Sequence, residues 1–187
     1  MSEPNWIEAQ FKAVQLAASQ RGKDERAALL KAAQDTPGQL VDWMITSQPV
    51  NIYIAVREDS SLIERSDEMG LNALHHASAD QSGLLTRILT ETPSKAPFMR
   101  DAFHRRPIDL AIEFENDASA ARLMPLTYPN AHRQPELLSE VKDLSSQSRL
   151  AETLENWRNQ QEQHDRETRQ TDLQKNIEKE EDRDFSR

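Results

Sequence analysis

Three histidines, His75, His76 and His104, are the side chains of this sequence best suited to bind a metal or to transfer a proton near neutral pH. A metal site on one helix needs two histidines at positions i and i+4, which share a face. His75 and His76 are adjacent, so they point to different sides of any helix that contains them. We therefore predict no metal site and no cofactor.

A nucleophilic enzyme is not predicted either. Ser60 and Ser61 lie near Asp59 and Glu64, but their spacing gives no nucleophile–base arrangement. The chain has no cysteine, which removes thiolate catalysis, disulfides and cysteine-ligated zinc. It has four glycines and no phosphate-binding glycine loop. We expect a protein without catalytic activity.

Composition limits the remaining classes. The 187 residues suffice for one domain and a charged terminal segment, because apolar residues (36%) are concentrated before Trp157. A net charge of −9 would repel nucleic-acid phosphates, so no nucleic-acid partner is expected. No apolar run is long enough to span a membrane, and the first residues do not resemble a secretory signal. We expect a cytoplasmic protein that is a monomer in isolation.

The elements that position these residues are predicted to be helices. Ile7, Phe11, Val14 and Ala18 mark one face of a helix over residues 5–19. Asp24 is expected to cap a second helix, and residues 36–38 a turn before a third. The expected buried residues of these two helices are Ala28, Leu29, Ala32, Ala33, Leu40, Val41, Met44 and Ile45.

The next stretch, residues 49–56, is rich in β-branched residues and partly alternating, which predicts a short strand or hairpin arm. Beyond it, helices are expected at about residues 72–79, 83–91, 107–114 and 118–124, with prolines in the loops between and after them.

Two stretches, residues 70–77 and 104–111, align with each other 34 positions apart. Each follows an aspartate at the same offset, Asp67 and Asp101. Each opens a short helix and is followed by a second helix. A period in the low thirties predicts stacked helix pairs, since one pair cannot bury its apolar face alone.

These stretches resemble the ankyrin repeat. The pattern residues of the first copy are Asp67, Gly70, Leu74, His75 and Ala77, and those of the second are Asp101, Pro107, Ile108 and Ala111. The second copy has His104 in place of the usual glycine and Asp109 in place of the histidine, so its turn is altered or strained. The resemblance implies that His75 links neighbouring turns.

A third, earlier copy is predicted from spacing, with an inner helix around Leu29 and an outer helix around Met44. It requires about 12 inserted residues, which coincide with the strand-like stretch. The fold class is thus an all-α ankyrin-type helical repeat stack. Its expected parts are an N-terminal capping helix (1–22), repeats (23–130) with an insert at about 48–64, C-terminal capping helices (131–157) and a charged tail (158–187).

The resemblance implies protein–protein interaction, through loop tips and the exposed face of the inner helices. The corresponding residues are Glu68, Met69, Leu71, Ala79, Asp80, Ala102, Phe103, Arg105, Glu113 and Phe114. Four of them are large apolar residues that the repeat core does not need. They form either a partner surface or a patch that the insert or the C-terminal helices cover.

The tail has several interpretations. Residues 158–187 are predicted to be a solvated, partly helical polyampholyte. Alternatively, Leu150, Leu154 and Trp157 together with Leu173 and Ile177 form a short partner helix or a self-associating coil. The acidic cluster at residues 178–182 resembles export signals of some secreted bacterial ankyrin effectors. The alternative to an intracellular adaptor is therefore a secreted effector that acts on host proteins.

Overall fold

The computed structural model describes residues 5–80 and 82–128, together with residues 159, 163 and 166. Over these residues every regular element is helical, which confirms the all-α prediction. The predicted C-terminal capping helices lie outside the described residues, as does all of the predicted tail except those three positions. None of the described helices is long and apolar enough to cross a membrane.

The described chain contains eight α-helices and two short 3-10 helices. The α-helices are α1 (Asn5–Ser19), α2 (Lys23–Asp35), α3 (Gln39–Ile45), α4 (Pro49–Glu58), α5 (Ala73–Ser78), α6 (Leu84–Leu89), α7 (Pro107–Glu113) and α8 (Asp117–Thr127). The 3-10 helices are η1 (Ser60–Glu64) and η2 (Ala96–Phe98). The first helix has the bounds that its apolar spacing predicts.

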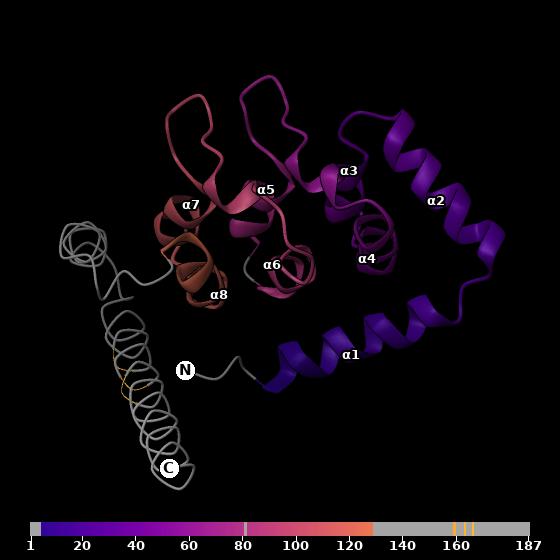
Figure 1. Cartoon of the computed structure of the whole chain (residues 1–187), viewed down its shortest axis with the longest axis horizontal. Coiled ribbons are helices and arrows are strands. Elements are labelled where there is room, and N and C mark those ends of the chain that lie inside the picture. The colour runs from indigo at the N-terminus through magenta and orange to yellow at the C-terminus, as the bar shows by residue number, and fades with distance from the viewer. Residues whose placement is uncertain (1–4, 81, 129–158, 160–162, 164–165, 167–187) are drawn as a thin grey trace, which may run out of the picture.

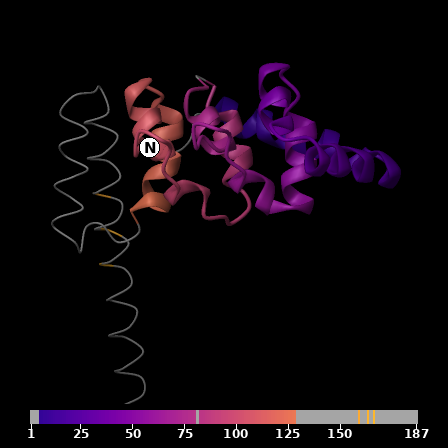
Figure 2. The ribbon, with the colours of Figure 1, turned by 90° about the horizontal axis from the view of Figure 1, so that it is seen from above.

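Helices α3 to α8 form three successive pairs. Helices α3, α5 and α7 lie in one row and their partners α4, α6 and α8 in a second (Figure 1), and the pairs follow one another along the molecule when it is seen from above (Figure 2). The first-row helices begin at residues 39, 73 and 107, at intervals of 34. Leu40, Leu74 and Ile108 are therefore equivalent, and all three are buried.

The second-row helices repeat in the same way. Two sets of residues, each spaced by 34, are buried in every copy: Ile52, Thr86 and Ala120, and Ala55, Leu89 and Leu123. Each pair thus presents the same face to its neighbours, and a continuous apolar core results.

The predicted strand at residues 49–56 is wrong, because these residues form most of α4. Pro49 occupies the first turn, where its missing N–H leaves no hydrogen bond unmade. Ile52, Ile54 and Val56 are all buried, since α1, α2, α3 and α6 contact the helix from several sides. A helix covered on all sides is apolar all round, and this pattern resembles that of a buried strand.

The predicted insertion is also corrected. The first pair is α3–α4, whose Leu40 precedes Leu74 by one 34-residue period. No added residues are needed at 48–64, where α4 and η1 lie. Leu29 belongs instead to α2, which contacts α3 and α4 at the end of the row. Asp24 is not the cap of that helix, since Gly22 is.

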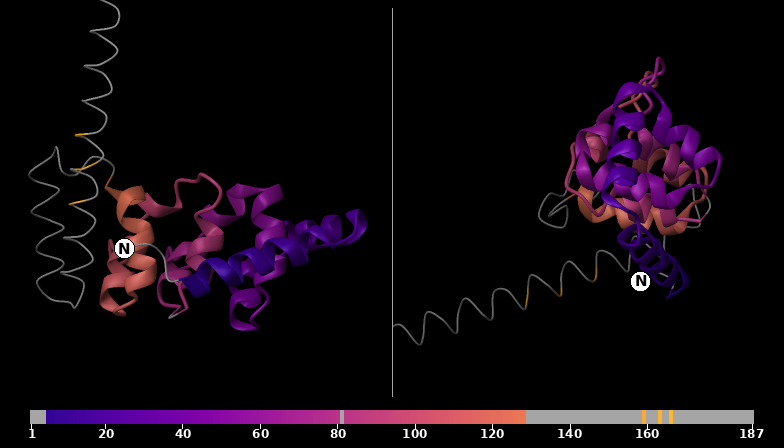
Figure 3. Two further views of the ribbon diagram at one scale, coloured as in Figure 1. Left: turned by 90° about the horizontal axis from the view of Figure 1, so that it is seen from below. Right: turned by 90° about the vertical axis from the view of Figure 1, so that its right-hand side faces the viewer.

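Helix α1 covers the second row rather than the end of the stack. It runs across α4 and α6 (Figure 3) and buries the predicted face of Ile7, Phe11, Val14 and Ala18. The guanidinium of Arg87 on α6 lies 3.9 Å from the centre of the Phe11 ring, and the Tyr53 ring of α4 meets Phe11 edge-on at 5.9 Å. Helix α1 therefore covers α4 and α6 of the second row, whereas it makes no comparable contact with the first row.

Three glycines that precede helices provide a graded test of this packing. Gly22 has an ordinary φ of −65°, and a Cβ added there would meet no atom. Gly38 has a φ of +81°, and a Cβ added there would also meet no atom. Gly83 has a φ of +67°, and an added Cβ would lie 2.7 Å from the Ala118 Cβ. We expect Gly83→Ala to lower the free energy of unfolding by about 3 kcal/mol, through backbone strain and a clash.

Gly38→Ala carries the strain alone and should lower the free energy of unfolding by about 1 kcal/mol, whereas Gly22→Ala should change it by less than about 1 kcal/mol. Urea denaturation of the three variants measures the order. Because all three positions are N-caps, the loss of capping preference is shared. Equal losses would contradict the close approach of α1, α6 and α8 at Gly83.

Candidate functional site

Two loops project from the first row of helices (Figures 1 and 3). We call residues 65–72 the first finger and residues 99–106 the second finger. The first is closed by Asp67, whose Oδ1 accepts the backbone N–H groups of Met69 and Leu71, both at 2.9 Å. The Asp67 backbone N–H in turn donates to the Leu71 carbonyl.

The second finger repeats this geometry 34 residues later. Asp101 Oδ1 accepts the backbone N–H groups of Phe103 (2.9 Å) and Arg105 (2.8 Å). The fingers lie side by side, because the Ala102 N–H donates to the Met69 carbonyl at 2.8 Å. The aspartate of each aligned stretch is thus the residue that shapes the loop.

The tight turn of each finger needs a left-handed residue. Gly70 has a φ of +77°, and a Cβ on it would lie 3.2 Å from the Ala102 nitrogen and the Asp101 Cα of the neighbouring finger. His104 keeps the same conformation, with a φ of +62°. The second turn is therefore not altered but strained, since a side chain in this region costs of the order of 1 kcal/mol.

His75 of α5 links the second helix pair to the second finger. Its Nδ1 accepts the Asn72 backbone N–H (3.2 Å), and its Nε2 therefore carries the proton and donates to the Arg105 carbonyl (3.0 Å). The side chain is fully buried. Burial lowers the pKa of His75 and outweighs the opposing effect of the bond to Arg105, so the ring is neutral at pH 7. The implied linking role is confirmed.

The other histidines point elsewhere. His76 Nε2 lies 3.4 Å from Asp67 Oδ2, and His104 is exposed on the second finger. Within residues 5–80 and 82–128, no three histidine or carboxylate groups gather as metal ligands would. In the equivalent place to His75, Asp109 accepts the Arg106 N–H at 2.7 Å and so fills the same capping role.

The serine–carboxylate cluster is structural. Asp59 is the N-cap of η1, and its Oδ1 accepts both the backbone N–H (3.1 Å) and the hydroxyl (2.6 Å) of Ser61. These bonds, first that of the hydroxyl and then that of Gln34, lower the pKa of Asp59. A carboxylate that is ionised and already bonded is a poor general base, so this arrangement does not activate a nucleophile.

Arg105 holds the second finger against α7. Its guanidinium pairs with Asp101 at 2.9 Å and with Glu113 at 3.0 Å, and it lies 5.0 Å from the Phe103 ring centre. Burial raises the pKa of Asp101, but the hydrogen bonds from Arg105 outweigh this effect, so the pKa lies below its usual value. Arg105 was predicted to contact a partner; within the chain it pairs with Asp101 and Glu113, and its contact with a partner stays a prediction.

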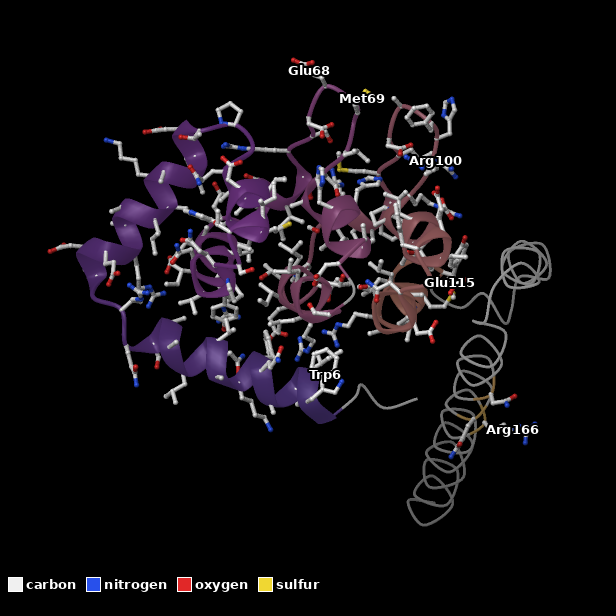
Figure 4. All side chains as sticks on the ribbon, turned by 180° about the vertical axis from the view of Figure 1, so that it is seen from behind. Trp6, Glu68, Met69, Arg100, Glu115 and Arg166 are labelled. Carbon is white, nitrogen blue, oxygen red and sulfur yellow. The ribbon has the colours of Figure 1, made fainter. Side chains whose placement is uncertain are left out.

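The predicted partner-binding residues fall into two groups. Leu71, Asp80 and Arg105 are half-buried. The exposed ones are Glu68, Met69, Ala79, Ala102, Phe103, Glu113 and Phe114. Figure 4 shows Glu68 and Met69 at the tip of the first finger, pointing away from the helices. The structure therefore places most of this set on the outward side of the fingers and the first row.

One exposed residue was missed. Ile45, predicted to be buried, is 76% exposed at the end of α3, and Trp43 is buried instead. Ile45 precedes Ala79 by 34 residues, so counting one period back from that residue would have found it. We define the finger face as the outward side of both fingers and of α3, α5 and α7 with the residues that directly follow these helices; its large exposed apolar residues are Ile45, Met69, Phe103 and Phe114.

The predicted alternative was that residues 48–64 fold over this patch. They form α4 and η1 instead, and Met69 and Phe103 remain 46% and 64% exposed. The part of the alternative that invokes the C-terminal helices falls outside the described residues.

The strained turn gives a stability test. We expect His104→Gly to raise the free energy of unfolding by about 1 kcal/mol, because relief of the left-handed strain exceeds the added entropy of the unfolded chain. Ala102→Gly on the same finger should lower it, since no strain is relieved there. Urea denaturation measures both; a destabilised His104→Gly variant would contradict the strain.

His75 gives a pH test. Its folded-state pKa is below the unfolded value of about 6.5, so the unfolded chain binds more protons at mildly acidic pH. The stabilising effect is complete above pH 6.5 and is lost as pH falls towards the folded pKa. We expect the free energy of unfolding to decrease from pH 7 to pH 5 by urea denaturation, and less so in His75→Gln. Parallel pH profiles would contradict the buried neutral ring.

No protein-family model, no curated protein and no solved structure matches the chain. Similarity to characterised proteins therefore gives no functional assignment. The function is therefore inferred from the geometry of the finger face.

Proposed function

We propose that this chain is an ankyrin-type stack that recognises another protein through the finger face and has no catalytic activity of its own. The support for the ankyrin type is the 34-residue interval between first-row helices and the two aspartate-closed fingers. The hydrogen bond from His75 to the next finger adds to it.

The observation that carries the binding proposal is the exposure of Ile45, Met69 and Phe103 on one face. Large apolar side chains that stay in water are unfavourable, and a row of them on a rigid element is typical of a protein interface. The elements beneath them are fixed by Asp67, Asp101 and Arg105, so little ordering entropy opposes binding.

The cellular location and the oligomeric state are also proposals. We propose an intracellular adaptor, with a monomer as its free form. A secreted effector remains the second candidate from sequence, but residues 178–182 lie outside the described residues and the finger face does not favour it over an adaptor.

The test is affinity capture from an extract of the source cells, with full-length protein as bait and mass spectrometry as the readout. We expect Met69→Ala/Phe103→Ala to recover about tenfold less of the specific partner, because such residues dominate interface energies.

Trp6→Ala/Leu16→Ala is the matched control: it removes one aromatic and one aliphatic residue of similar exposure from α1, away from the fingers. Circular dichroism verifies that both variants are folded. Equal recovery by wild type and the finger variant, with the control unchanged, contradicts the proposal.

A further inference from the structure

We propose that the finger face selects a protein segment that carries net positive charge beside its large apolar side chains. This inference rests on the proposed function and adds the chemistry of the partner. It comes from where the carboxylates of this face lie and which of them are already paired.

Acidic groups outnumber basic ones on the fingers and the first row. Arg106 and Asp109 neutralise each other at the start of α7. The remaining carboxylates are those of Asp42, Asp67, Glu68, Asp80, Asp101 and Glu113, and the remaining guanidinium groups are those of Arg65, Arg100 and Arg105.

The three guanidinium groups are held within the chain. Arg105 pairs with Asp101 and Glu113. Arg65 donates to the carbonyls of Ala33 (3.2 Å) and Gln34 (2.8 Å) at the end of α2, and Arg100 donates to the carbonyl of His104 (2.6 Å). None of them pairs with Asp42, Glu68 or Asp80.

Three of these carboxylates have no cationic partner within residues 5–80 and 82–128. No ion pair among the described residues includes Asp42, Glu68 or Asp80, although Asp80 accepts the Ser82 hydroxyl. Asp42 lies one helical turn before Ile45, and Glu68 directly precedes Met69. Each of these two exposed apolar residues therefore has an unpaired carboxylate beside it.

This arrangement determines which partner can dock. A partner that covers Ile45 and Met69 also removes water from the neighbouring carboxylates, and an ionised carboxylate is destabilised when it loses water without a counter-charge. A neutral or acidic segment leaves that loss uncompensated. A segment with lysine or arginine side chains beside its apolar residues can pair with Asp42 and Glu68 when it docks. The field of these carboxylates also attracts such a segment from a distance.

The experiment selects a random phage-displayed peptide library in parallel on the full chain and on Met69→Ala/Phe103→Ala. We expect the full chain, and not the variant, to enrich peptides that combine large apolar residues with net positive charge. An enriched peptide is then synthesised with a fluorophore, and its affinity is measured by fluorescence anisotropy.

Asp42→Asn/Glu68→Gln should bind this peptide about fivefold more weakly, as expected for the loss of two exposed pairs. Asp24→Asn/Glu25→Gln, which removes the same charge from α2, should bind as the wild type does. Added salt should weaken peptide binding by the wild type more than peptide binding by Asp42→Asn/Glu68→Gln, since salt screens exposed charges.

The outcomes separate the two levels of the proposal. Neutral or acidic peptides that require Met69 and Phe103 overturn the charge selection and leave the binding face intact. Equal weakening by the finger and α2 charge variants overturns it as well, because net charge alone would then explain the preference. If the full chain enriches nothing beyond the Met69→Ala/Phe103→Ala variant, the proposed function itself fails.

Discussion

Each helix pair of this chain has an apolar face that only a neighbouring pair can cover, and the whole arrangement depends on that constraint. Leu40, Leu74 and Ile108 lie at the same place in successive pairs, so burying one requires the next pair to be in register. Polar contacts then fix the register more finely. His75 reaches the carbonyl of Arg105 in the following unit, and the Ala102 N–H reaches the carbonyl of Met69 in the preceding one. Both hydrogen bonds connect one repeat to the next, so the fingers follow the same 34-residue interval as the helices.

Because α1 covers α4 and α6 but not the first row, the two rows differ in how far other helices cover them. Phe11 and Ile7 are buried against α4 and α6, whereas nothing in the described chain is placed in the same way against Met69 or Phe103. Some large apolar residues of this fold therefore remain exposed in the described chain. Trp6 and Leu16 on α1 are as exposed as Met69 and Phe103, but Met69 and Phe103 lie on loops that Asp67 and Asp101 close, and this combination is the basis for proposing that the finger face binds a partner.

The sequence predicts some of these features well and others not at all. The face of α1 follows from spacing alone, because a long amphipathic helix has a clear 3.6-residue pattern. The equivalence of Asp67 and Asp101 follows from self-alignment. The first helix pair was predicted to begin with the helix of Leu29, but it begins with that of Leu40. Both leucines lie in apolar helical stretches, and only the interval of 34 residues from Leu40 to Leu74 distinguishes them. The strand-like composition of α4 reflects contact with five other helices, α1, α2, α3, α6 and η1, which is tertiary information that no local pattern contains.

Three residues other than glycine, Ser47, His104 and Glu115, have a positive φ among the described residues. Ser47 and Glu115 have positive φ values in the turns between the helices of the first and third pairs, 68 residues apart, which is twice the period, so the same strained turn occurs in both pairs. His104 differs, because its equivalent in the first finger is a glycine that meets the same geometry without strain. The second finger accepts this strain beside the exposed ring of Phe103, and Asp42 and Glu68 stay unpaired beside exposed Ile45 and Met69. Stability would be served by a glycine, by cations and by polar side chains at these places, so the finger face is the part of the molecule least explained by folding and best explained by a partner.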